Sequence, residues 1–369
     1  MSDRILVASR KGLFTIRRLQ GRWQIASVNN LGDTFTALLH DPRSGHIYAA
    51  AKHDHFGPRL FKSVDEGASY ESAGLPTYPP KPEGTVDVEP AGGRVVPWAL
   101  KSIWCLETGN ANEPGLLWCG TLPGGLFRST DHGATWALNR PLWDHPLRQD
   151  WFGGGAEFPA IHSICVHPTD GKRLSIAVSC AGVWHTEDGG ASWFLACKGM
   201  RAEYMPPEQA LAEESQDPHR MVRCATSPDR MWVQHHNGIF RSDDGGRNWT
   251  EMQKLGPSNF GFGVVVHPQD PDRAWFVPGI KDEMRIPVNG RLVVTRTSDG
   301  GKTAEVLSQG LPGPHAYDLV YRAALDIDST GERLAFGTTT GALFVTDNGG
   351  DSWTEISSHL PPIYAVRFA

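Results

Sequence analysis

The sequence predicts an all-β fold, a seven-bladed β-propeller with four-stranded blades, on three observations. An eight-residue motif recurs along the whole chain, short apolar runs alternate with turns, and Gly and Pro are abundant, at 41 and 27 of 369 residues. Regular repeats of this size are typical of propellers and solenoids. Frequent Gly and Pro suit a chain that turns often between short strands.

The recurring motif reads Ser/Thr-x-Asp-x-Gly-x-x-Trp. Its Asp carboxylate and its hydroxyl can accept hydrogen bonds from turn amides, its Gly allows a positive φ, and its aromatic ring can pack on the sheet. We therefore expect a folding device between the third and fourth strands of each blade, with no catalytic role. Complete copies span 129–136, 186–193 and 242–249, and degenerate copies span 63–70 with Tyr70, 297–304 with Ala304 and 346–353 with Asn348.

The first blade has to be assembled from both ends of the sequence. The runs 5–9, 12–17 and 23–28 look like the second, third and fourth strands of a blade, and no first strand precedes them. The run 363–368 can supply that strand, which closes the ring and removes an open sheet edge. We expect one propeller domain over 1–369, with blades at approximately 1–30 plus 361–369, 33–74, 95–140, 158–199, 219–254, 259–309 and 316–360.

Charge and hydropathy exclude several classes of partner. The net charge is −6 and no run of five basic residues occurs, which argues against nucleic-acid binding. No stretch approaches 18 apolar residues and the N-terminal apolar run is too short for a secretory signal, so we expect a cytoplasmic protein without membrane contact. The six cysteines form no CxxC motif, which predicts buried, reduced thiols.

Four long insertions indicate which face carries the function. They span 73–96, 139–158, 199–220 and 278–290, and the blade pattern places all four on the face opposite the eight-residue motifs. Long loops on a rigid scaffold commonly build a binding site. We therefore expect an axial pocket for a small-molecule substrate on that face, with the same loops available for oligomer contacts.

The eight-residue motif resembles the Asp-box of the sialidase-like, or BNR-repeat, propellers. The runs 55–57, 151–155, 235–238 and 315–317 resemble those of a group of bacterial cytoplasmic BNR-repeat proteins classed as glycosyl hydrolases. The resemblance implies a hydrolase of glycosidase or sialidase-like type.

Sialidases bind the substrate carboxylate with three arginines and use a Tyr nucleophile activated by a Glu, with an Asp as acid/base. By resemblance, the nucleophile is Tyr317 or Tyr321, its base Glu157 or Glu283, and the acid Asp54 or Asp318. The sialidase Arg-Ile-Pro signature lies before the first Asp-box, whereas here the triplet begins at Arg285 in the sixth blade. This departure argues against true sialidase activity.

Cationic and aromatic residues on the same rim are candidates for substrate binding. Aligning the inner strands on their closing residues places Arg223 and Arg322 at one level, where they form either an anion clamp or two structural arginines bound to carbonyls. Trp98 offers a sugar-stacking surface. The remaining candidates are Arg220, Arg285, Lys281, His236, Asn237 and His315.

Histidines on this rim support a second hypothesis. His53 and His55 can point to one side of a hairpin, and nitrogens from His219, His236 and His315 can join them around Zn, Cu or Fe. No compact ligand motif is present, so the sequence requires no cofactor.

Three functions therefore stay open. The first is a hydrolase acting on a small polar or anionic, sugar-derived substrate in the axial pocket. The second is a metal-dependent enzyme using the rim histidines, and the third is a non-enzymatic docking or assembly factor. The concentration of acids and bases on one rim favours an enzyme.

Overall fold

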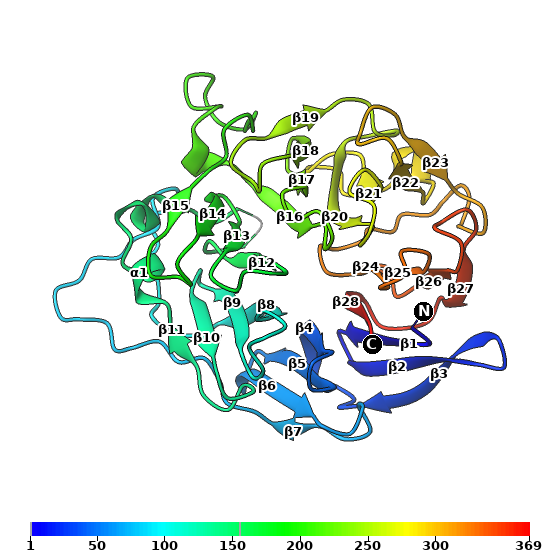
Figure 1. Cartoon of the computed structure of the whole chain (residues 1–369), viewed down its shortest axis with the longest axis horizontal. Coiled ribbons are helices and arrows are strands. Elements are labelled where there is room, and N and C mark those ends of the chain that lie inside the picture. The colour runs from blue at the N-terminus through cyan, green and yellow to red at the C-terminus, as the bar shows by residue number, and fades with distance from the viewer. Residues whose placement is uncertain (1, 155) are drawn as a thin grey trace.

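The computed structural model describes residues 2–154 and 156–369. The strands form seven four-stranded antiparallel sheets around a central axis, which confirms the predicted seven-bladed β-propeller (Figure 1). The helices are short, namely α1 (Arg140–Trp143) and the 3-10 segments Pro146–Asp150, Glu213–Ser215 and Val288–Gly290. None of the described helices is long and apolar enough to cross a membrane.

The blades follow one another along the chain, and the innermost strand of each faces the axis (Figure 1). Blade 1 contains β28 (Ile363–Phe368), β1 (Arg4–Ser9), β2 (Gly12–Leu19) and β3 (Arg22–Asn29). Blade 2 contains β4 (Thr34–Asp41), β5 (His46–His53), β6 (Gly57–Ser63) and β7 (Glu71–Ser72). Blade 3 contains β8 (Ser102–Thr108), β9 (Leu117–Leu122), β10 (Leu126–Ser129) and β11 (Ala137–Leu138).

The other four blades repeat this order from the axis outward. Blade 4 contains β12 (Ile161–Val166), β13 (Leu174–Val178), β14 (Gly182–Thr186) and β15 (Phe194–Leu195). Blade 5 contains β16 (Pro218–Arg223), β17 (Met231–His235), β18 (Gly238–Ser242) and β19 (Thr250–Met252). Blade 6 contains β20 (Phe260–Val266), β21 (Ala274–Gly279), β22 (Val294–Thr297) and β23 (Glu305–Leu307). Blade 7 contains β24 (Leu325–Ile327), β25 (Leu334–Gly337), β26 (Leu343–Thr346) and β27 (Thr354–Ser357).

The ring is closed by the last strand, as predicted. β28 pairs antiparallel with β1, with Val366 opposite Val7. Ile363, Ala365 and Val366 are completely buried, so this strand belongs to the core of blade 1. Both ends of the chain therefore lie in the same blade (Figure 1).

The eight-residue motifs adopt one hydrogen-bonded turn between the third and fourth strands. In blade 4, the Thr186 hydroxyl donates to Asp188 Oδ1 at 2.7 Å and accepts from the Gly190 amide at 2.9 Å. The amide and hydroxyl of Ser192 both donate to the same carboxylate, at 2.9 and 2.6 Å. Asn348 makes the equivalent acceptor contacts in blade 7, so a neutral amide can replace the carboxylate.

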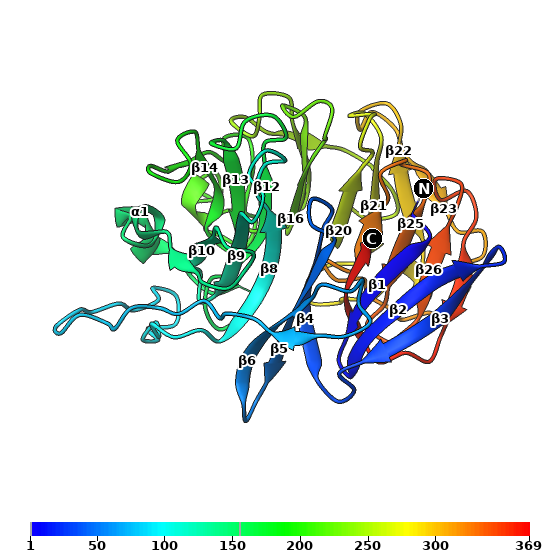
Figure 2. The ribbon, with the colours of Figure 1, turned by 60° about the horizontal axis from the view of Figure 1, so that its bottom comes forward.

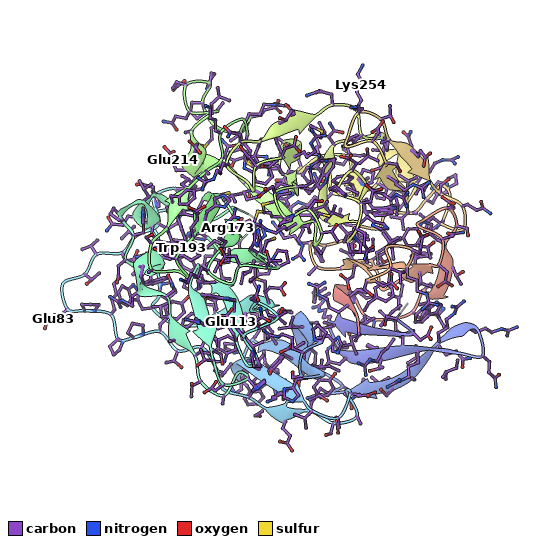
Figure 3. The ribbon with its side chains drawn as sticks, in the orientation of Figure 1. Glu83, Glu113, Arg173, Trp193, Glu214 and Lys254 are labelled. Atoms are coloured by element: carbon purple, nitrogen blue, oxygen red, sulfur yellow. The ribbon has the colours of Figure 1, made fainter. Side chains whose placement is uncertain are left out.

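The aromatic residue that ends a motif connects its blade to the preceding one. Trp193, labelled in Figure 3, is buried and donates its Nε1–H to Asn139 Oδ1 of blade 3 at 2.9 Å. Trp136 and Trp249 donate in the same way to the Gly74 and Ala196 carbonyls of the blades before them. The motif thus stabilises the turn within a blade and the packing between blades.

The long loops lie on the face of the ring opposite the eight-residue motifs or extend from the outer edge of the ring. The segment between β7 and β8 reaches furthest outward, with Glu83 at its tip (Figures 2 and 3). Val86 and Val95 of this segment are exposed, at 81% and 65%.

All six cysteines are buried and free.

Candidate functional site

A cavity of about 610 Å³ lies at the axis, on the face opposite the eight-residue motifs. Its walls come from the beginnings of the innermost strands and from the hairpins between second and third strands. Those positions are at the other end of each blade from the turns that hold the motifs. The insertions 139–158, 199–220 and 278–290 add Phe152, Tyr204, Asp282 and Arg285.

A bulge in the innermost strands aims side chains into this cavity. In six of the seven blades, the pairing between the first and second strands shifts register near the cavity. A bulged residue leaves the ladder, and its side chain can be redirected. The residues skipped by the pairing that also line the cavity are Thr36, Trp104, His162, His219, Phe262 and Tyr364.

Asp217, His219 and His236 form a compact polar cluster in the cavity wall. Asp217 Oδ2 lies 3.5 Å from His219 Nε2 and 3.4 Å from His236 Nδ1. One ligand atom from each of the three residues lies within 4.8 Å of the others. The other carboxylate oxygen, Oδ1, accepts hydrogen bonds from the Cys180 amide at 3.2 Å and the Ser179 hydroxyl at 3.3 Å.

Blade 5 holds this cluster through its own backbone. Asp217 immediately precedes β16, His219 lies in β16, and His236 lies in the hairpin between β17 and β18. The His236 amide donates to the Asp217 carbonyl at 3.0 Å, and the Asp217 amide donates to His235 Nε2 at 3.0 Å. The backbone of blade 5 thus places all three residues at the same end of its first three strands.

The protonation states in the cluster follow from burial and hydrogen bonding. Burial raises the pKa of the Asp217 carboxyl, but the facing imidazoles outweigh it and hold the pKa well below its ordinary value. Burial lowers the pKa of His219, against the opposing effect of Asp217. Burial and the contact between the two groups therefore act in opposite directions on the pKa of each.

The tautomer of His219 is determined by the neighbouring blade. His219 Nδ1 lies 2.7 Å from the Gly261 carbonyl oxygen, which can only accept, so Nδ1 carries the proton. His219 Nε2 is therefore the nitrogen that faces Asp217. The ring stacks on Phe262, with centroids 4.4 Å apart and an interplanar angle of 11°, which restricts its rotation.

Arg322 lines the cavity, and no ion pair between it and a carboxylate occurs in the described part of the chain, as is also true of the exposed Lys52 on the same wall. Its Nε is buried without a hydrogen bond, and its guanidinium lies 5.6 Å from the Trp104 ring centroid and 5.1 Å from that of Phe262. Burial lowers the pKa of Arg322, yet an arginine stays charged at neutral pH. Aromatic faces cover the guanidinium planes without using its N–H donors.

Arg285 also lines the cavity, but its charge is already compensated. Its Nε lies 2.9 Å from Asp282 Oδ1, and its guanidinium lies 5.3 Å from the Phe262 ring centroid. Arg322 is therefore better placed than Arg285 to bind an anion.

Two further buried groups border the cavity. His162 donates or accepts through Nδ1 with the Ser163 hydroxyl at 3.0 Å, while its Nε2 is buried without a partner. Burial holds the pKa of His162 well below its ordinary value, so the ring is neutral. Burial also raises the pKa of the Cys180 thiol, which therefore cannot supply a thiolate nucleophile at neutral pH.

The structure gathers part of the predicted site and separates the rest. Tyr321, Arg322, Arg285, His219 and His236 line the cavity. The predicted residues that do not line it are Tyr317, Glu157, Glu283, Asp54, Asp318, Arg223, Arg220, Lys281, Asn237, His315, Trp98, His53 and His55.

The prediction that Arg223 and Arg322 form an anion clamp is wrong, because only Arg322 lines the cavity. Arg223 ends β16, and it donates to the Pro228 carbonyl at 2.7 Å and to the Ser175 hydroxyl at 2.9 Å. It is one of the structural arginines that the sequence left as the alternative. Arg220 lies on the axis in a separate small cavity with Glu107 and Arg367.

The predicted acids and bases are also not assembled around a tyrosine. Glu157 and Asp54 are exposed, and exposed Glu283 lies 3.4 Å from Lys281 Nζ. Asp318 accepts from the Thr340 hydroxyl outside the cavity. Tyr321 lies in the cavity, but its aromatic neighbours there are Phe262 and Tyr364.

The remaining rim candidates have other structural roles. His53 Nδ1 accepts from the amides of its own loop, and His55 is exposed. Exposed His315 pairs with Tyr317, 3.3 Å from its hydroxyl, instead of joining the other histidines. Asn237 Oδ1 accepts from the Glu203 amide at 2.8 Å, and Trp98 donates to Asp87 Oδ2 at 2.8 Å.

Sequence reasoning missed Asp217, His162, Trp104, Phe262 and Tyr364. A signal existed for Asp217. Asp217 and His219 lie two positions apart at the start of an inner strand, and residues at this spacing can share one side of a strand. The other four depend on bulges, which the alternation of apolar residues does not reveal.

Comparisons with known proteins support the fold. No family model matches the sequence, and no curated protein matches it. The GH74 xyloglucanase from Xanthomonas campestris is 18% identical with a TM-score of 0.65, over 97% of this chain and 53% of that one. The chain thus spans about half the length of that enzyme.

Two other solved structures match over most of both chains. A candidate 6-phosphogluconolactonase from Bacteroides fragilis is 12% identical with a TM-score of 0.58, over 99% of this chain and 97% of that one. YCF48 bound to D1 peptide is 13% identical with a TM-score of 0.51, over 88% and 82%. At these identities the likeness shows a shared fold and no more.

Proposed function

We propose that the protein is a hydrolase acting on a small anionic molecule in the axial cavity. The observation that carries this proposal is Arg322, a charged side chain that lines the cavity with a buried, unpartnered Nε. A guanidinium binds carboxylates and phosphates well because its donors match the geometry of two oxygens. The anion itself would complete the contacts of Arg322.

The rest of the cavity suits a compact, sugar-derived substrate. Its volume of about 610 Å³ is within the range of small-molecule sites. Trp104, Phe262, Tyr321 and Tyr364 supply aromatic surface on which a sugar ring can pack. Two structural neighbours, one named as a xyloglucanase and one as a candidate lactonase, are consistent with a sugar-derived substrate.

The Asp217 cluster would activate the attacking water. In the hydrolysis, the water oxygen bonds to the electrophilic carbon, the bond to the leaving group breaks, and the proton released by the water passes to the leaving oxygen. The cluster supplies a carboxylate and two imidazoles for that proton transfer. This differs from the sialidase-like scheme, since among residues 2–154 and 156–369 no carboxylate hydrogen bond to Tyr321 supports a tyrosine nucleophile.

A substrate panel tests the proposal. The panel contains aryl glycosides of acidic sugars, carboxylated aryl esters and sugar-acid lactones, each with its neutral counterpart. We expect turnover of anionic members, and Arg322→Met to raise their KM by about 10- to 100-fold, the value of a charged hydrogen bond. Arg223→Met, outside the cavity, is the matched control. An unchanged KM for the anionic members in Arg322→Met, or no hydrolysis of any anionic member, would contradict the proposed function.

A further inference from the structure

We infer that Asp217, His219 and His236 bind a divalent transition metal, with a coordination position open to the axial cavity. The inference deepens the proposed function, on which its catalytic role rests, because it names what activates the water. Metal binding itself is a separate property that can be measured without a substrate.

The donor set is the first argument. One carboxylate and two imidazoles are a common protein ligand set for Zn²⁺ and Fe²⁺ in catalytic sites, where a further position remains for water or substrate. The three ligand atoms lie within 4.8 Å of one another, close enough to share one ion after small side-chain rotations. Asp217 and His219 are buried and His236 is partly buried at the cavity wall.

The hydrogen bonds around the cluster orient these atoms as ligands. His219 donates through Nδ1 to the Gly261 carbonyl, which leaves Nε2 to face the cluster. Metal-binding histidines almost always donate their other ring N–H in this way. Asp217 uses Oδ1 for the Cys180 amide and the Ser179 hydroxyl, so Oδ2 is left for the cluster.

The contact between Asp217 and His219 is the second argument. His219 Nε2 and His236 Nδ1 lie 3.5 and 3.4 Å from the same oxygen, Asp217 Oδ2. Two atoms that each lie about 2.0–2.1 Å from a tetrahedral ion are about 3.3–3.4 Å apart, so these separations suit ligands of one ion. No Lys or Arg ion pair with Asp217 occurs among the described residues, so no fixed side-chain cation competes for this position.

A third observation comes from His162, on the same cavity. Its Nε2 is buried and unpartnered, although buried nitrogens normally have a partner. A water or substrate bound at the open metal position could donate to it. His53, His55 and His315 contribute nothing to this site, because they lie outside the cavity.

Zinc titration of the metal-free protein tests the site. The full-length protein is stripped with a chelator, and Zn²⁺ binding is measured by calorimetry, with Co²⁺ absorption as a second probe. We expect one equivalent of Zn²⁺ and a Zn²⁺-dependent rise in Tm, because an ion that binds the native state stabilises it. His236→Ala and His219→Ala should each weaken binding by at least about 100-fold.

His315→Ala is the control, since it removes a histidine on the same face but outside the cavity. It should bind Zn²⁺ like the wild type. If His219→Ala does not fold, His236→Ala still decides the question, because His236 is partly exposed and its removal leaves the strands intact. Absence of Zn²⁺ and Co²⁺ binding by the wild type, or unchanged binding by His236→Ala, would overturn the site.

The two proposals fail in different ways. Hydrolysis that depends on Arg322 and survives complete chelation would overturn the catalytic role of the metal and leave the hydrolase, with an imidazole as the base. Stoichiometric Zn²⁺ binding lost in His236→Ala, without hydrolysis of any panel member, would retain the metal site and remove the proposed function.

Discussion

His219 Nδ1 lies 2.7 Å from the carbonyl oxygen of Gly261, so the backbone of blade 6 determines which nitrogen of a blade 5 histidine faces the cavity. The two residues lie in the innermost strands β16 and β20. Because that carbonyl can only accept, its position controls the tautomer as well as the orientation of the ring. The chemistry of the site therefore depends on the packing of adjacent blades.

Gly261→Ala should disturb this contact without removing a polar group. A Cβ at Gly261 would lie 2.7 Å from the Val277 carbonyl oxygen, so the strand has to shift. Displacing the acceptor of a ligand histidine typically weakens metal binding by about 10- to 100-fold, and we expect that loss in a Zn²⁺ titration. Gly263→Ala is the control, since its nearest atom is the Leu325 Cβ at 3.3 Å. Equal affinities in the two variants would show that the Gly261 carbonyl does not orient His219.

Arg223→Met should reduce stability and leave substrate binding unchanged. The substitution removes the hydrogen bonds to the Pro228 carbonyl and the Ser175 hydroxyl, far from the cavity. Loss of hydrogen bonds from a charged donor costs about 1–3 kcal/mol. Thermal or urea unfolding should show the loss, while KM for an anionic substrate stays at the wild-type value. A raised KM would place Arg223 in the site after all.

Asp188→Asn should make stability less dependent on pH in the acid range. Hydrogen bonds from Ser192 and Thr186 lower the pKa of Asp188 to about 2. A carboxyl whose pKa is lower in the folded state stabilises the fold above its unfolded pKa near 4, and this contribution is lost as the pH falls towards 2. The difference in Tm between wild type and Asp188→Asn should therefore shrink between pH 5 and pH 2, values chosen to bracket about 4.

The reverse substitution, Asn348→Asp, is the matched control for Asp188→Asn. Asn348 occupies the same turn in blade 7 and accepts from the Thr346 hydroxyl and the Ser352 amide. The Tm of Asn348→Asp relative to wild type should fall as the pH falls from about 5 to about 2, because this variant gains a carboxylate in the turn. If the Tm difference from wild type is independent of pH in both variants, the motif carboxylate acts through packing alone.

Deletion of residues 363–369 should destroy the cooperative fold. The deletion removes β28, whose Ile363, Ala365 and Val366 are completely buried, and it exposes an edge of β1. We expect aggregation or loss of the sharp thermal transition, measured by light scattering and circular dichroism. A peptide of residues 361–369 added in trans should partly restore the transition. A truncated protein with the wild-type Tm would show that ring closure adds little stability.

Much of the fold was predictable because its signals are local. The hydrogen bonds of a motif turn join residues at most 4 positions apart. The missing first strand of blade 1 is evident from the order of apolar runs. The face of the cavity follows from the same order, since hairpins and motif turns alternate between the two ends of a blade. Tyr321, Arg322, Arg285, His219 and His236 lie in the cavity for this reason.

The composition of the site was less predictable. Counting back from the closing residues of the inner strands placed Arg223 at the level of Thr36, but Arg223 lies at the far end of β16, opposite Met231. The count took Ser227 as the closing residue of this strand, but β16 ends four residues earlier, at Arg223. Counting back from Ser227 therefore stopped at the end of the strand that lies away from the cavity.

The sequence by itself determined the seven-bladed ring, its closure by the last strand and the turns that join the strands, since these depend on neighbours along the chain. Only the tertiary structure decided that Asp217, His219 and His236 meet and that Arg322 lies against Trp104 and Phe262. Those contacts depend on register shifts and on packing between blades. Neither is encoded in the spacing of residues within one blade.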